Sequence, residues 1–189
     1  MTRREILKYT ALATGTAIAT PLVTSLFSGC KPDVAKLPNY KPLFFDENQF
    51  SILKKLVDII LPKTDSPAAT EVGVQNIIDT MLAQVYTSEE QVEYKKGFQN
   101  MLEYLNGGAE QMEEVASKLS LEKLQQLITS TDEAAKPAKD AFSQLRQQTV
   151  AYYLSTEEIG KNYLNYLPVP GEYEACIQLS DVGGKAWAI

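Results

Sequence analysis

The side chains that could carry out chemistry in this sequence do not gather into a catalytic pattern. Histidine is absent from all 189 residues, which excludes a Ser-His or Cys-His nucleophile pair, a His-ligated zinc site and a c-type haem. The adjacent acidic pairs Glu113-Glu114 and Glu157-Glu158 are typical of solvated helix faces rather than of a metal site. The sequence therefore predicts no metal and no acid–base pair.

Carboxylates and glycines elsewhere in the chain lead to the same expectation. Asp58 and Asp65 flank Pro62 and could form a carboxylate pair, but a helix-end cap and a turn residue explain them more simply. Gly107-Gly108 and Gly183-Gly184 are isolated pairs and not a phosphate-binding loop after a strand. This excludes a dinucleotide-binding fold, so we expect no catalytic and no cofactor-binding residue in this chain.

Residues 1–29 are typical of an export signal. Arg3 and Arg4 stand together at the head, and a mildly apolar stretch follows them. Their order, Thr-Arg-Arg-x-Ile-Leu-Lys, favours the twin-arginine (Tat) route, which exports folded proteins. The alternative is an ordinary Sec signal that carries two arginines. The stretch is too weakly apolar, and too interrupted by Pro21, for a membrane span.

The signal ends at a cysteine. Small residues directly before Cys30 resemble a bacterial lipobox, although Phe27 stands where that pattern prefers leucine. We expect lipid on Cys30 and hence a periplasmic, membrane-anchored lipoprotein; the alternative is a buried cysteine. Several acyl chains on one residue anchor a protein firmly, whereas a single chain is marginal.

Cys176 is the second of the two cysteines. If Cys30 carries lipid, Cys176 has no partner within its own chain. It is then a buried thiol, a reactive thiol or one half of a bridge to another chain.

The rest of the sequence predicts a linker followed by one all-α domain. Residues 30–45 hold Pro32, Pro38 and Pro42 and read as an extended linker. Residues 46–189 predict a single helical bundle with an irregular tail rich in Tyr, Pro and Gly, because apolar residues recur at helical spacing. A chain with 44% apolar residues can bury one core, and a net charge of -6 argues against a nucleic-acid partner.

The helix boundaries come from capping signals and breakers. Asp46 with Gln49 predicts a capping box for a first helix that ends at Pro62, and Ser88 with Gln91 predicts the cap of a third. Val92, Phe98, Met101, Leu102 and Leu105 are expected on the buried face of that third helix. Other helices are expected over 74–85, around 111–118, over 121–128, and as a last long helix through 142–153.

The C-terminal tail differs from the bundle in composition. It is rich in tyrosine and proline, so it is not regular helix throughout, and it holds Trp187, the only tryptophan. Trp187 either folds back onto its own bundle or, with Tyr166, Tyr173 and Cys176, contacts a partner, because aromatic residues are enriched among binding anchors.

Several segments in this order resemble the gluconate 2-dehydrogenase subunit 3 family, the small subunit of membrane-associated flavin-dependent sugar and sugar-acid dehydrogenases. The likeness extends from about Phe50 to about Cys176. Lys63 and Ala69 depart from the family's pattern at one turn. The matching pieces are Ile59–Ala69, Glu71–Val74, Ile77–Asp79, Phe142, Arg146–Thr149, Tyr152–Ser155, Gly160, Tyr166–Tyr173 and Cys176.

The resemblance implies an accessory subunit without an active site of its own. Such subunits bind a large catalytic subunit of the glucose-methanol-choline oxidoreductase type, help it mature with its FAD and carry it out through the Tat system. A separate cytochrome or other acceptor takes the electrons. Two alternatives stay open: a free-standing exported lipoprotein with a structural or ligand-holding role, and a chain that adds a residue or two to its partner's active site.

Overall fold

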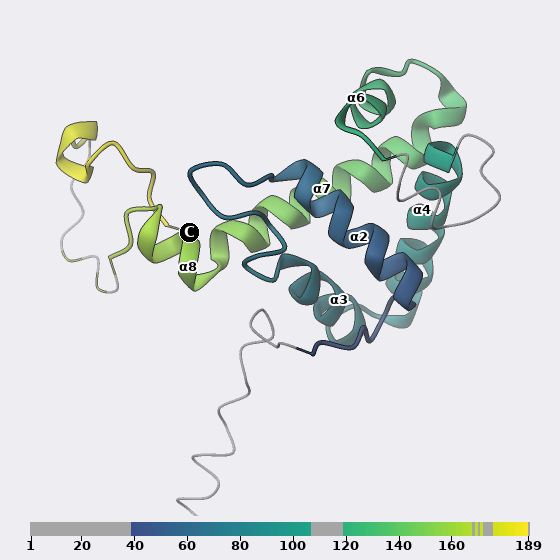
Figure 1. The fold of residues 1–189 in the computed structure, drawn as a ribbon, viewed down its shortest axis with the longest axis horizontal. Coiled ribbons are helices and arrows are strands. Elements are labelled where there is room, and N and C mark those ends of the chain that lie inside the picture. The colour runs from purple at the N-terminus through teal and green to yellow at the C-terminus, as the bar shows by residue number, and fades with distance from the viewer. Residues whose placement is uncertain (1–38, 107–118, 168, 170, 172–175, 189) are drawn as a thin grey trace, which may run out of the picture. The chain divides into compact units, whose positions relative to one another are not determined.

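The computed structural model describes residues 39–106, 119–167, 169, 171 and 176–188. Within these residues the chain is all-α, as the sequence predicts, and its only strand-like pairing is one isolated bridge between Asn165 and Trp187. The helices, shown in Figure 1, are α2 (Glu47–Ile60), α3 (Val74–Gln84), α4 (Ser88–Asn106), α6 (Leu121–Thr129), α7 (Lys136–Ser155) and α8 (Glu157–Asn162), with short 3-10 turns η2 (Glu133–Ala135) and η3 (Leu179–Val182). The signal, the expected helix around 111–118 and most of the expected linker lie outside the described residues.

The first helix begins and ends as its sequence signals predict. Asp46 accepts the backbone N–H of Gln49, and the Gln49 side chain accepts the Asp46 N–H, which completes the capping box. The helix ends at Ile60, two residues before Pro62.

The predicted cap of the third helix is wrong by one residue. Ser88 is already the first residue of α4. The Thr87 hydroxyl accepts the Glu90 N–H at 3.3 Å, and the Glu90 carboxylate accepts the Thr87 N–H at 2.8 Å. The pairs Ser88–Gln91 and Thr87–Glu90 have the same spacing. Thr87–Glu90 forms the cap because the Glu90 carboxylate is a charged acceptor for the exposed Thr87 N–H.

The core forms around α7, which contacts α2, α3, α4, α6 and α8 (Figure 1). Phe98 and Leu102 of α4 are buried in it as expected, but Val92 is 68% exposed. Val92 precedes the buried Tyr94 by two residues, about 200° around a helix, so it faces away from the core. The largest fully buried side chains are Ile52, Leu53, Leu56, Val57, Ile78, Leu82, Met101, Leu102, Leu124, Leu127, Leu145 and Ile159.

The segment before α2 is fixed to α3 by a buried carboxylate. Asp79 is fully buried and accepts the Tyr40 hydroxyl at 2.6 Å. It also accepts three successive backbone N–H groups, those of Leu43, Phe44 and Phe45. Phe44 and Phe45 belong to the hydrophobic core, so the last residues of the predicted linker are part of the packed domain.

The loop between α2 and α3 is held at both ends. Asp58 accepts the backbone N–H and the hydroxyl of Thr70 at 2.9 and 2.8 Å, and the Tyr153 hydroxyl of α7 donates to the Pro67 carbonyl. Asp65 is exposed on this loop. Asp58 therefore fixes a turn, which agrees with the structural explanation of this carboxylate rather than the catalytic one.

Candidate functional site

The C-terminal tail returns to the residues that follow α8. The Asn165 N–H donates to the Ala186 carbonyl at 2.7 Å, and the Ala188 N–H donates to the Asn165 carbonyl at 3.1 Å. The Lys185 ammonium adds a bond of 2.9 Å to the Asn162 carbonyl. These three bonds place the end of the chain beside α8 (Figure 1).

Two glycines shape the turn that makes this return possible. Gly183 and Gly184 follow η3 with φ of 64° and 75°, a left-handed conformation that few other residues adopt easily. The Gly184 N–H donates to the Leu179 carbonyl at 2.9 Å and closes the turn. The glycine pair is thus a structural turn, in agreement with the exclusion of a phosphate loop.

The tail region exposes much of its apolar surface. We call its large exposed residues the C-terminal apolar surface. Trp187 is 49% exposed and lies outside the core cluster, although its backbone is paired with Asn165. The surface consists of Tyr163, Tyr166, Leu167, Val169, Leu179 and Trp187, each 38% exposed or more. Tyrosine and tryptophan among these exposed residues are suited to a partner contact, because aromatic residues are enriched among binding anchors.

The bridge brings two of the predicted partner-contact residues into one locality. Tyr166 directly follows Asn165, whose backbone pairs with that of Trp187. The tail therefore folds back through its backbone, while the Trp187 side chain stays half-exposed. Tyr173, and the predicted targeting and lipid residues Arg3, Arg4 and Cys30, lie outside the described residues.

Cys176 has an exposed thiol with no disulfide partner among the described residues. Of the three alternatives, the buried thiol is therefore contradicted, and a reactive thiol or a bridge to another chain remains. Its backbone has a φ of 61°, the left-handed region that a residue with a Cβ adopts at some cost.

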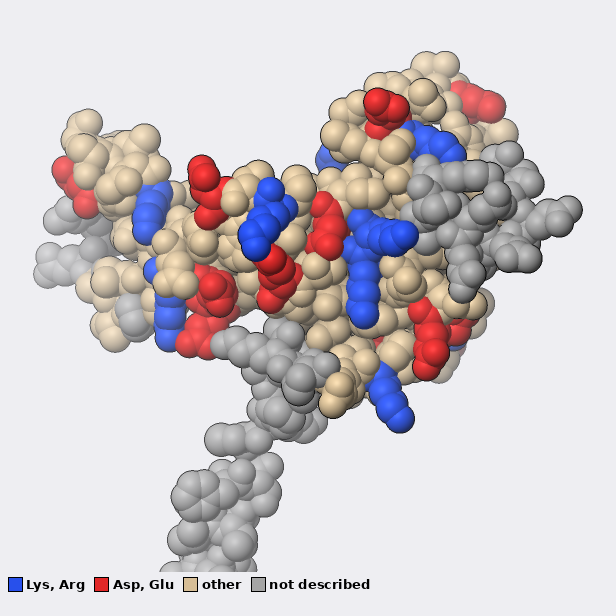
Figure 2. All heavy atoms as spheres, viewed as in Figure 1, with Lys and Arg blue, Asp and Glu red and all other residues tan. Residues whose placement is uncertain are grey.

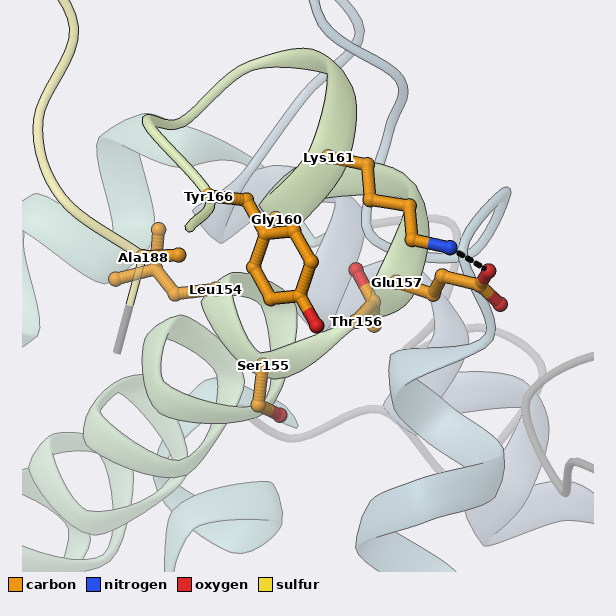
Figure 3. Close-up of a pocket in the computed structure, with 8 residues that line it drawn as sticks. All are labelled: Leu154, Ser155, Thr156, Glu157, Gly160, Lys161, Tyr166 and Ala188. Atoms are coloured by element: carbon orange, nitrogen blue, oxygen red, sulfur yellow. Dashed lines mark hydrogen bonds and ion pairs between the residues drawn. The ribbon is translucent and has the colours of Figure 1, made fainter. Parts of the chain in front are cut away.

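A pocket of about 250 Å³ lies where α7, α8 and the tail meet (Figure 3). The Lys161 ammonium and the Glu157 carboxylate form an exposed ion pair of 2.6 Å at its side. That hydrogen bond raises the pKa of Lys161 above its usual value. The lining residues are Leu154, Ser155, Thr156, Glu157, Gly160, Lys161, Tyr166 and Ala188. Glu157 thus lies on a solvated helix face, as its sequence context suggests; Glu113 and Glu114 lie outside the described residues.

The charged side chains of the described residues form neither a basic patch on the face drawn in Figure 2 nor a metal-binding cluster. On the face seen in Figure 2, Lys and Arg alternate with Asp and Glu and do not gather into one patch. Within the described ranges no cluster of three or more His, Cys, Asp or Glu side chains could hold a metal ion. In the same ranges, no helix has the length and apolar character needed to cross a bilayer.

Sequence reasoning missed Asp79 and the pocket. Asp79 follows Ile78 on the apolar face of α3 and is fully buried. A lone carboxylate on such a face could have signalled a structural anchor, because buried charges need dedicated hydrogen-bond donors. The pocket left no comparable signal, since its wall comes from Ala188 at the far end of the chain.

Within the described residues, the fold is that of a small all-α protein whose C-terminal tail exposes aromatic side chains. A family model agrees: that of Gluconate 2-dehydrogenase subunit 3 matches residues 47–171, so the chain belongs to this family. The match spans α2 to α8 and the start of the tail, and confirms the resemblance drawn from the sequence. Searches of curated proteins and of solved structures gave no match.

Proposed function

We propose that this chain is the non-catalytic accessory subunit of an FAD-dependent sugar or sugar-acid dehydrogenase of the glucose-methanol-choline type. It binds the large catalytic subunit, assists its maturation with FAD and takes it through the Tat route to the periplasm. Lipid on Cys30 then keeps the pair at the membrane, near a cytochrome or another electron acceptor. The FAD belongs to the partner and not to this chain.

Membership of the subunit 3 family is the observation that carries this proposal. The C-terminal apolar surface supports it, because a half-exposed tryptophan and two exposed tyrosines are suited to burial against another protein. The absence of histidine supports the assignment of catalysis to the partner. A twin-arginine signal is also suited to a cargo that folds and takes up flavin before export.

Purification from the native membrane tests the binding role. The tagged full-length chain, extracted in mild detergent, is expected to bring down a larger yellow protein that releases FAD on denaturation. A chain that elutes alone, monomeric and colourless, would support a free-standing lipoprotein instead. Sugar-dependent dye reduction by the chain alone would contradict the non-catalytic assignment.

Export and anchoring are tested by separate variants. With Arg3→Lys and Arg4→Lys together, both proteins are expected to stay in the cytoplasm; unchanged export would identify a Sec signal. With Cys30→Ala, a complex that still reaches the periplasm is expected to leave the membrane fraction. Persistent membrane association of Cys30→Ala would show that something other than lipid holds it.

A further inference from the structure

Gly160 lies inside α8 without a conformational need for glycine. Its φ is not in the left-handed region, and its N–H donates to the Thr156 carbonyl at 2.9 Å as in any helix. A glycine inside a helix is less favourable than alanine by about 1 kcal/mol. Gly160 is nevertheless buried, and a Cβ built on it would meet no atom within 4 Å outside its chain neighbours and the backbone of its own helix. The space that a side chain would fill is therefore left open, and it belongs to the pocket.

The walls of the pocket offer hydrogen-bond acceptors. The Ser155 hydroxyl donates to the Tyr152 carbonyl, and the Thr156 hydroxyl donates to the Tyr153 carbonyl, each at 2.8 Å. A hydroxyl has one hydrogen, so both oxygens can only accept a further bond. The Glu157 carboxylate adds charged acceptor oxygens at the side of the pocket. An occupant that bonds to these oxygens must carry hydrogen-bond donors, N–H or O–H.

The remaining wall is aromatic. Figure 3 shows the Tyr166 ring across the pocket, between Gly160 of α8 and Ser155 at the end of α7. Tyr166 is 48% exposed, so part of its ring is open to a ligand. A planar cation with several N–H donors stacks on such a face and bonds to a carboxylate at its edge.

Among side chains, arginine combines these properties. We propose that this pocket receives an arginine side chain of the catalytic partner subunit, stacked on Tyr166 and hydrogen-bonded to Glu157 and the hydroxyls of Ser155 and Thr156. This rests on the proposed accessory function and adds the chemistry of the contact. The exposed Lys161–Glu157 pair is held weakly enough for a guanidinium to displace or share it.

Filling the pocket from within tests the proposal without removing any contact. Gly160→Phe places a ring in the open space, and Gly160→Ala is the matched control that adds one methyl group. Both full-length variants are expected to keep the helical circular dichroism of the wild-type chain and to unfold at or above its unfolding temperature, because glycine is the less favourable residue in a helix. Capture of the flavoprotein is expected to fall about tenfold or more with Gly160→Phe and to stay within about twofold with Gly160→Ala.

Small probes distinguish the chemistry of the occupant. N-acetyl-arginine amide is expected to release the captured flavoprotein at concentrations where N-acetyl-lysine amide, of equal charge, and N-acetyl-tryptophan amide do not. Tyr166→Leu, which removes the ring and keeps its bulk apolar, is expected to abolish the difference between the arginine and lysine probes. Release by the tryptophan probe alone would overturn the arginine assignment.

The outcomes separate the two proposals. If the wild-type chain and a folded Gly160→Phe variant capture the flavoprotein equally well, the pocket contact is overturned. The proposed accessory function is unaffected by that result. A wild-type chain that captures no flavoprotein overturns both.

Discussion

The hydroxyl of Tyr40 donates a hydrogen bond of 2.6 Å to the carboxylate of Asp79, across 39 residues of sequence. Burial and this bond raise the pKa of Tyr40 well above its usual value. The same carboxylate collects the N–H groups of three successive residues, 43–45. One buried carboxylate thus fixes the irregular segment 43–45 to α3.

Removal of this carboxylate should be costly. Asp79→Ala leaves buried N–H donors without an acceptor and is expected to lower the free energy of unfolding by about 3 kcal/mol. Tyr40→Phe removes the hydroxyl that bonds to Asp79 and Thr80, and is expected to cost about 1.5 kcal/mol. Urea unfolding of the full chain, followed by circular dichroism, measures both. Asp65→Ala, in an exposed turn, is the control, and an equal loss there would contradict the anchor role.

Alkaline pH should weaken the fold through a buried tyrosine. Tyr94 is buried and donates to Gln148 at 2.9 Å. Burial, with smaller contributions from Tyr86 and Tyr152, raises its pKa above the usual 10.0. Because the folded state holds this proton longer than the unfolded state does, stability is unaffected below pH 10 and falls as the pH rises above it.

The Tyr94→Phe variant tests this dependence. It is expected to be less stable than wild type at pH 8, since it loses the bond to Gln148, yet to lose less further stability between pH 9 and about 11.5. Thermal unfolding across this range measures the slope. A variant with the wild-type slope would assign the alkaline loss to other groups, of which Tyr40 is the first to examine.

The two faces of α4 should respond differently to truncation. Phe98 is 3% exposed and Val92 is 68% exposed. Phe98→Ala is expected to cost about 3–4 kcal/mol, and Val92→Ala less than about 0.5 kcal/mol. Denaturant midpoints at unchanged slope would report these differences. A large loss at Val92 in the isolated chain would contradict its outward position.

The single tryptophan gives a direct probe of docking. Trp187 is 49% exposed, so acrylamide should quench its emission readily in the isolated chain. If the C-terminal apolar surface docks against the partner, quenching is expected to fall severalfold in the complex, and the emission to shift to the blue. A complex with Trp187→Phe gives the emission of the partner's own tryptophans, which is subtracted. If the quenching constant of Trp187 is then the same in the complex as in the isolated chain, the interface lies elsewhere.

The thiol of Cys176 can be titrated without unfolding. In a Cys30→Ala chain, a thiol reagent is expected to modify one cysteine under native conditions, because Cys176 is exposed. In the native complex this reactivity is expected to disappear. If a non-reducing gel shows a heavier band that Cys176→Ser removes, the loss of thiol reactivity is due to a disulfide with another chain. If no such band appears, the loss is due to coverage of the thiol by the partner. Full reactivity in the complex would exclude both.

The helices could be predicted because their signals are local. The capping pair Asp46–Gln49, the breaker Pro62 and the spacing of Phe98, Leu102 and Leu105 each act within one or two turns. One prediction was wrong where two local capping signals competed, at Thr87 and Ser88. Another was wrong at Val92, which was assigned to the buried face because it is apolar, although its angular position around the helix axis points it away from the core.

The candidate site depended on contacts that no local pattern encodes. The pocket needs Ala188 beside α8, and that position depends on backbone bonds between Asn165 and residues 186 and 188. The anchor at Asp79 likewise joins residues more than thirty positions apart. Composition could predict an aromatic tail, but only the fold shows that Tyr166 stands over a space left open by Gly160.

The Asp79 anchor also limits how far the domain can lie from Cys30. Tyr40, which is bonded to Asp79, lies ten positions after Cys30, and ten residues of chain span at most about 35 Å. With lipid on Cys30, Tyr40 cannot lie farther than about 35 Å from the bilayer, whatever partner the domain binds. Under the proposed function, a catalytic subunit bound to this domain would be confined to the same layer beside the bilayer.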